Sequence, residues 1–71
     1  NYSINNIDIN IITENPKIQK YRKKIIKSIS KICMLNTSQI SVKGKTAEKL
    51  GLIGKEKAIA SEVITSINQN A

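Results

Sequence analysis

The sequence has no histidine, tryptophan or phenylalanine, and it has a single cysteine and a single proline among 71 residues. Because Cys33 has no second cysteine to pair with, an intramolecular disulfide is excluded. Without histidine, the chain cannot build a zinc site from histidine and cysteine ligands, and a serine or cysteine nucleophile would lack a histidine base. The composition therefore argues against a self-contained metalloenzyme or hydrolase.

The chain is also short for a self-sufficient fold. Its 71 residues fit one small domain and exclude two. A domain near this size buries only about 60% of the surface that its unfolded chain exposes. We therefore expect oligomerisation, or a further piece of chain, to supply part of the stability.

Acidic residues are few: five Asp or Glu stand against twelve Lys or Arg, which gives a net charge of +7. Two explanations stay open. Isoleucine, lysine and asparagine make up nearly half of the sequence, as an AT-rich genome would encode, so the lysines can be a solvated face; or they form a selected anion-binding surface. Two tyrosines are too few for a base-stacking platform. No apolar run approaches the roughly 20 residues of a membrane span.

A strand is predicted over residues 7–12, where isoleucines alternate with polar residues. Asn15 can cap a following helix, with Pro16 at its first position. The helix should run to Cys33, because apolar side chains recur at spacings of three and four. The predicted apolar face comprises Ile18, Tyr21, Ile25, Ile29 and Ile32, widened by Ile26 and Cys33. We expect this face to pack on a sheet; a basic helix on a membrane or in a major groove is the alternative.

The second half of the chain predicts a loop over 34–39 and a short strand from Ile40 that ends at the Gly44-Lys45-Thr46 triplet. A short helix is expected over 46–50, a third strand over 59–67 and a frayed tail over 68–71. The predicted class is α/β (α+β): strand, helix, strand, short helix, strand, forming a mixed sheet with one helix layer.

The Gly44-Lys45-Thr46 triplet is similar to the end of a phosphate-binding loop. A Walker loop needs a glycine where this chain has Gln39, so a nucleoside triphosphatase is rejected. A weaker alternative stays open beside an ordinary turn: backbone N–H groups and the Thr46 hydroxyl could bind phosphate at a helix N-terminus.

Three blocks of the sequence together resemble one enzyme family, the 2-C-methyl-D-erythritol 2,4-cyclodiphosphate synthases. Residues 6–18 resemble that family's N-(V/I)-D-(V/A)-T-I-I-A-x-x-P-K-(M/L), and residues 42–51 resemble V-K-A-T-T-x-E-x-L-G. Residues 54–62 resemble G-R-G-E-G-I-A-x-E. All three blocks are in register without a gap. The resemblance covers the C-terminal portion of the family's domain, so the family's Asp-x-His and later His metal ligands would lie elsewhere.

The resemblance implies an intramolecular phosphoryl transfer in non-mevalonate isoprenoid synthesis. The 2-phosphate of 4-diphosphocytidyl-2-C-methyl-D-erythritol 2-phosphate attacks the diphosphate, CMP leaves, and 2-C-methyl-D-erythritol 2,4-cyclodiphosphate forms. It also implies zinc with Mg or Mn as cofactors, and a homotrimer with active sites between subunits. We expect a cytidine diphosphate-linked substrate, no nucleic-acid or membrane partner, and no activity of the 71-residue chain alone.

The family's site residues carry over by position. Thr46 matches the threonine that binds the phosphates in the transition state, and Glu48 matches the glutamate associated with the divalent ion. Glu62 matches a glutamate near the trimer axis, where Lys55 matches an arginine and Leu52 an aromatic residue. The implied substrate-binding residues, of which those from 13 to 19 hold the cytidine, are Thr13, Glu14, Asn15, Pro16, Lys17, Ile18, Gln19, Lys45, Ala47, Leu52 and Lys55.

Several positions depart from the family pattern. Lys45 stands where the family has the first threonine of its pair, and residues 56–58 replace a glycine-glutamate-glycine. Lys55 in place of arginine loses bidentate phosphate recognition. Two rivals therefore stand beside the synthase: a catalytically dead remnant and a small basic nucleic-acid-binding module. The expected location is the bacterial cytoplasm, with a plastid-type organelle as the alternative.

Overall fold

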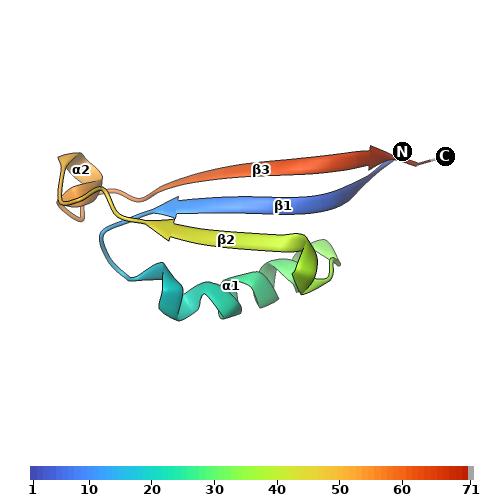
Figure 1. Ribbon diagram of the computed structural model, residues 1–71, viewed down its shortest axis with the longest axis horizontal. Coiled ribbons are helices and arrows are strands. Elements are labelled where there is room, and N and C mark those ends of the chain that lie inside the picture. Colours follow the sequence, from blue (N-terminus) through green and yellow to red (C-terminus); the bar gives the residue numbers. More distant parts are fainter. Residues whose placement is uncertain (71) are drawn as a thin grey trace.

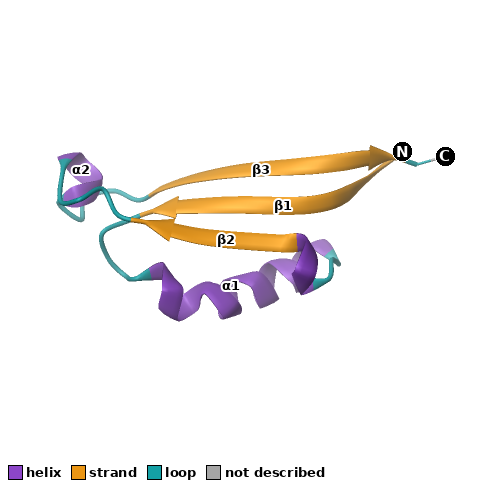
Figure 2. Cartoon of the chain, viewed as in Figure 1, coloured by secondary structure: helices purple, strands orange, loops and turns teal. Residues whose placement is uncertain are grey.

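The computed structural model describes residues 1–70 and shows one sheet with one helix packed along it (Figure 1). Strands alternate with helical segments along the chain (Figure 2). The elements are β1 (Tyr2–Ile12), α1 (Ile18–Cys33), the 3-10 helix η1 (Thr37–Gln39), β2 (Ile40–Lys45), α2 (Gly51–Gly54) and β3 (Ala60–Gln69).

The sheet is mixed, with the strand order β2-β1-β3. β1 pairs with β2 in parallel, from Ile7 opposite Ile40 to Ile12 opposite Lys45. It pairs with β3 in antiparallel fashion, so that Ile12 lies opposite Ala60. The predicted class and element order are thereby confirmed, because the parallel pair is joined by the crossover helix α1, which forms the one helix layer.

The antiparallel strands β1 and β3 are both longer than their hydrophobic patterns predicted. β1 begins at Tyr2, which lies opposite Gln69 at the end of β3. The extension is polar: Asn5 Nδ2 donates to Ser66 Oγ at 3.2 Å, and the Ser66 hydroxyl also contacts Asn6 Oδ1. The frayed tail expected over 68–71 is paired as far as Gln69, and Ala71 lies outside the described residues. Ladder pairing, rather than burial, orders this end of the sheet.

The core lies between α1 and the edge of the sheet formed by β1 and β2. Ile7, Ile40 and Val42 are buried there. On the helix, the half-buried apolar residues are Ile18, Ile25, Ile26, Ile29 and Cys33. Tyr21 and Ile32 were expected on the same face but are 44% and 80% exposed, so that part of the prediction is wrong. The helix lies over β2 rather than over the centre of the sheet (Figure 1). The sheet therefore covers only a narrow part of the apolar face of α1.

The start of α1 also differs from the expectation. The helix begins at Ile18 with Lys17 in the N-cap position, and not at Pro16 with Asn15 as its cap. The Asn15–Pro16 peptide bond is cis. No helix among the described residues is long and apolar enough to cross a membrane.

The segment after β2 corrects two further expectations. β2 runs through Gly44 to Lys45 instead of ending at the glycine. The helix expected over 46–50 is a loop, because Glu48 and Lys49 have positive φ values of 53° and 62°. The helical turn comes later, at α2. A phosphate site at a helix N-terminus beside Thr46 is therefore ruled out.

Close packing between Gly44 and Ile18 joins the start of α1 to β2. A Cβ added at Gly44 would lie 2.5 Å from Ile18 Cβ, which real structures do not tolerate without a shift. The synthase motif quoted above has alanine at the first position and methionine or leucine at the second. Compared with the motif, this chain has a smaller residue at position 44 and a β-branched residue at position 18. The Ile18 side chain therefore occupies the space that the alanine Cβ of the motif would fill.

We predict that Gly44→Ala lowers the free energy of unfolding of the intact protein by about 1–3 kcal/mol, the usual cost of overpacking. Ile18→Met added to Gly44→Ala should recover part of that loss, because it restores the motif's pair. Urea denaturation of the wild type, both single variants and the double variant gives the coupling energy. Strict additivity, or a Gly44→Ala variant as stable as the wild type, would contradict the predicted contact.

Candidate functional site

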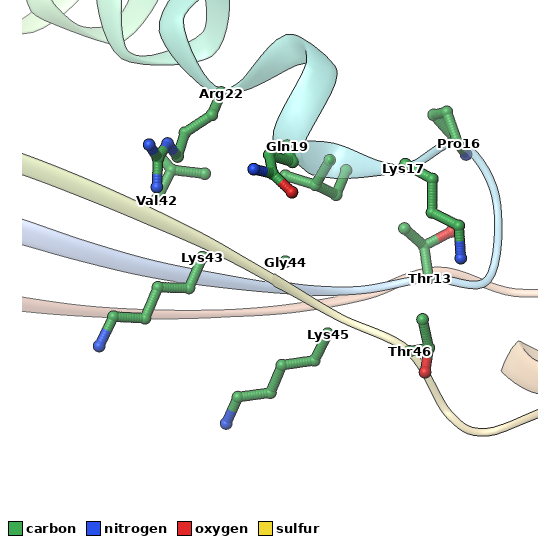
Figure 3. Close-up of a pocket in the computed structure, with 11 residues that line it drawn as sticks. Thr13, Pro16, Lys17, Gln19, Arg22, Val42, Lys43, Gly44, Lys45 and Thr46 are labelled. Atoms are coloured by element: carbon green, nitrogen blue, oxygen red, sulfur yellow. The ribbon is translucent and has the colours of Figure 1, made fainter.

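A cavity of about 450 Å³ lies where the first turn of α1 faces the end of β2 (Figure 3). Two chain segments that are 20 or more residues apart in sequence form its walls. Its lining residues are Thr13, Pro16, Lys17, Ile18, Gln19, Arg22, Val42, Lys43, Gly44, Lys45 and Thr46. The structure thus brings most of the predicted 13–19 segment together with Lys45 and Thr46.

Thr13 fixes the two walls to each other at the base of the cavity. It is only 4% exposed. Its backbone N–H donates to the carbonyl oxygen of Lys45 at 2.9 Å, which continues the β1–β2 pairing by one residue. Its hydroxyl donates to the carbonyl oxygen of Asn15 at 2.8 Å and so holds the turn that leads to α1. Thr13 therefore acts as a structural anchor of the cavity.

Side-chain directions decide which charges face the cavity. In Figure 3, Arg22 extends from α1 toward Val42, and Lys17 extends toward Thr13. Lys43 and Lys45 extend to the other side of β2, away from α1. This follows from strand alternation, because Val42 and Gly44 occupy the helix-facing positions. Lys45 therefore lines the cavity near its backbone, and the cations on the helix side are Lys17 and Arg22.

The loop that carries Thr46 and Glu48 is held by Glu14. Glu14 Oε1 accepts the backbone N–H of Ala47 at 2.8 Å and that of Lys49 at 2.9 Å. The N–H of Glu48 makes a longer contact of 3.4 Å with Thr46 Oγ1. Ala47 and Glu48 do not line the main cavity; they lie in the loop that follows it, beyond Thr46.

Gly54 closes the other side of this loop. A Cβ at Gly54 would lie 2.7 Å from Lys49 Cα, so only glycine fits there. The N–H of Gly54 donates to the carbonyl oxygen of Leu50 at 3.0 Å. A second cavity of about 480 Å³ adjoins the loop and is lined by Glu14, Asn15, Lys17, Lys49, Gly54, Lys55 and Glu56. Asn15 and Lys55 therefore belong to this second cavity.

Two other predicted site residues lie away from both cavities. Leu52 is 67% exposed on α2. Glu62 is exposed on β3, where Asn10 Nδ2 donates to its Oε1 at 3.3 Å across the sheet. The structure of one chain does not bring either residue to the cavity that Thr46 lines.

Four lining residues were missed at the sequence level: Arg22, Val42, Lys43 and Gly44. Signals for two of them were present. Arg22 follows Ile18 by four residues and so shares its helix face. Gly44 sits inside a strand, where glycine often marks the close approach of another backbone or side chain.

The carboxylate and thiol groups of the described residues can be examined as possible ligands of a metal ion. Among residues 1–70, no group of three or more Asp, Glu or Cys side chains is placed to hold a metal ion. The described residues therefore do not fit the zinc site that the resemblance implies.

Comparison with known proteins gives the family. The sequence signature of the YgbB family matches residues 1–68. The chain belongs to the YgbB family. It is 65% identical over 69 residues to the bifunctional enzyme IspD/IspF of Pelagibacter ubique, covering 97% of this chain and 19% of that protein. It is 61% identical over 59 residues to the apicoplast 2-C-methyl-D-erythritol 2,4-cyclodiphosphate synthase of Plasmodium falciparum, covering 83% of this chain and 25% of that protein.

Solved structures of this YgbB-family fold agree with the one described here. The crystal structure of the Plasmodium vivax 2C-methyl-D-erythritol 2,4-cyclodiphosphate synthase superposes with a TM-score of 0.97 at 41% identity, covering all of this chain and 47% of that one. A CDP complex of Plasmodium falciparum IspF gives a TM-score of 0.87 at 54% identity, covering 94% and 42%. The family resemblance is confirmed, and the chain spans less than half the length of these relatives.

We predict that Gly54→Ala opens the loop over 46–50, since its methyl group collides with the Lys49 backbone. Hydrogen exchange of that segment should become faster, and the free energy of unfolding should fall by about 1–3 kcal/mol. Gly51→Ala is the matched control: Gly51 has a φ of 67° and open space around it. That variant should cost about 1–2 kcal/mol, because alanine is strained at this φ, and leave exchange over 46–50 unchanged. Equal exchange in both variants would refute the predicted collision.

Proposed function

We propose that this chain forms the cytidine-binding and phosphate-binding walls of a 2-C-methyl-D-erythritol 2,4-cyclodiphosphate synthase. In the reaction, an oxygen of the 2-phosphate forms a bond to the diphosphate phosphorus that is esterified to methylerythritol. The bond from that phosphorus to the bridging oxygen breaks, and CMP leaves with the electron pair. The observation that supports this proposal most directly is the cavity that lies between the 13–19 segment and Thr46, just after β2.

The cytidine wall is the turn before α1. Pro16, Lys17 and Ile18 line the cavity, and the first turn of α1 leaves backbone N–H groups free to bind a base or a phosphate. Five of the carried-over positions line this wall, namely Thr13, Pro16, Lys17, Ile18 and Gln19, whereas Glu14 and Asn15 line the adjoining cavity. Support also comes from the relative whose structure is a CDP complex, which superposes over 94% of this chain.

The phosphate wall is the end of β2 and the loop after it. Thr46 lines the cavity, and its oxygen already accepts the N–H of Glu48, so its O–H is free to donate to a phosphate oxygen. Lys45, Ala47 and Glu48 flank it. Transition states of phosphoryl transfer are stabilised mainly by positioning and by charge neutralisation. We propose that Thr46 positions the diphosphate and that Lys17 and Arg22 neutralise part of its charge.

Metal ions complete the proposal, with the zinc ligands supplied from outside this chain. Zinc with Mg or Mn would polarise and neutralise the phosphates in the assembled enzyme. Because residues 1–70 do not fit a zinc site, we assign the zinc ligands to another part of the enzyme and no step here to a metal. Glu48 is proposed as a carboxylate beside the divalent ion.

A homotrimer is proposed as the working assembly. Val63, Ile64 and Ile67 on β3 are each more than half exposed, which leaves apolar surface for neighbouring subunits. Leu52, Lys55 and Glu62 would then act near the trimer axis or at sites between subunits. Relatives occur in a bacterium and in an apicoplast, so the bacterial cytoplasm and a plastid-type organelle are both proposed locations.

We predict that Thr46→Ala weakens binding of CDP to the intact protein by about tenfold to a hundredfold, the range for a lost hydrogen bond to a charged group. Thr46→Ser keeps the hydroxyl and should bind CDP within about threefold of the wild type. Isothermal titration calorimetry with CDP measures both variants. Thr37→Ala, the same change in η1 at the far end of β2, is the control and should bind normally.

Three outcomes would contradict the proposed function. Wild-type protein that binds neither CDP nor CMP would remove the nucleotide site. Tight, strongly salt-dependent binding of arbitrary duplex DNA, in place of CDP, would favour the basic-module rival instead. A protein that binds CDP normally but shows no turnover when assembled with metals would indicate the catalytically dead remnant.

A further inference from the structure

We propose that Glu14 is a positioning residue: its carboxylate holds the loop over 46–49 in the shape that presents Thr46 and Glu48 to the substrate. The inference rests on the proposed function for the roles of those two residues. The resemblance placed Glu14 among the substrate-binding residues, but the structure directs its side chain at the protein's own backbone.

The Glu14 carboxylate clamps the loop through two hydrogen bonds. One oxygen of Glu14 accepts two backbone N–H groups, at 2.8 Å from Ala47 and 2.9 Å from Lys49. Glu14 itself is half-buried between the turn before α1 and the loop. Hydrogen bonds from N–H groups to an ionised carboxylate are stronger than those to neutral acceptors.

The loop needs such a partner because of its own conformation. Glu48 and Lys49 are consecutive non-glycine residues with positive φ, a region that L-residues avoid. Backbone N–H groups that a turn brings together can form a concave site for an anion, and the N–H groups of Ala47 and Lys49 converge on Glu14 Oε1 in this way. Here the anion is the Glu14 side chain. Without this carboxylate, the backbone N–H groups of Ala47 and Lys49 lose their acceptor, and this conformation of the loop is less stable.

The position of Glu14 also links the two walls of the cavity. It directly follows Thr13, whose N–H bonds to the carbonyl oxygen of Lys45 at 2.9 Å. The Thr13 bond fixes the end of β2, and the Glu14 bonds fix the loop beyond it. Removing the Glu14 carboxylate should therefore release the phosphate wall while the cytidine wall stays in place.

A role through hydrogen bonding can be separated from a role through charge. The amide oxygen of Glu14→Gln can accept the same two N–H groups, whereas Glu14→Ala removes the acceptor. If Glu14 instead served as a proton acceptor or a cation ligand, the glutamine variant would fail as badly as the alanine variant. Rescue by glutamine is therefore the decisive comparison.

The experiment uses the intact protein that carries this sequence, with CDP and cytidine as separate ligands in calorimetry. Glu14→Ala should weaken CDP binding by about tenfold and change cytidine binding by less than about twofold. Glu14→Gln should restore CDP affinity to within about threefold of the wild type. Hydrogen exchange over 46–50 should be faster in the alanine variant only. Glu56→Ala, which removes another carboxylate from the second cavity, is the matched control and should match the wild type.

The outcomes against the proposal are distinct. Equal losses of CDP and cytidine binding in Glu14→Ala would mean a general structural role. A glutamine variant as weak as the alanine variant would mean that the charge acts, and unchanged exchange over 46–50 would mean that there is no clamp. If the wild type binds neither ligand, the proposed function fails, and the exchange comparison still decides whether Glu14 holds the loop.

Discussion

Close contact between the first turn of α1 and the end of β2 is the constraint on which the cavity depends. Gly44 lets Ile18 approach the strand, and this approach sets the spacing between the two walls. The Thr13 N–H bond to Lys45 then fixes where β2 ends relative to the turn. Since Thr46 follows directly, its place at the cavity is a consequence of backbone packing, and a small change at Gly44 would be felt there.

The regular elements with a clear hydrophobic pattern could be predicted from the sequence. Alternating isoleucines in β1 and the spaced apolar residues of α1 gave the strand, the helix and the mixed-sheet class. The outer ends of β1 and β3 could not be predicted, because Asn5, Asn6 and Ser66 pair through polar contacts and bury little. The exposed Ile32 likewise shows that periodicity marks a helix face without saying how much of it the sheet covers.

The candidate site was predictable where it depends on local sequence and family motif, as at Pro16, Lys17 and Thr46. It was not predictable where the cause lies far along the chain. The helix expected over 46–50 is absent because Glu14, more than 30 residues earlier, captures the N–H groups of Ala47 and Lys49. No local propensity encodes that contact. Arg22 shows the converse case, since a four-residue helix spacing would have been enough to find it.

Asn1 and Asn70 lie side by side at the edge of the described residues farthest from the cavity (Figure 1). The N–H of Asn70 bonds to the carbonyl oxygen of Asn1 at 2.8 Å, and the long axis of the molecule extends 48 Å (Figure 1). A reporter group attached to a side chain at this edge would therefore sense the β1–β3 ladder and leave the cavity between α1 and β2 clear.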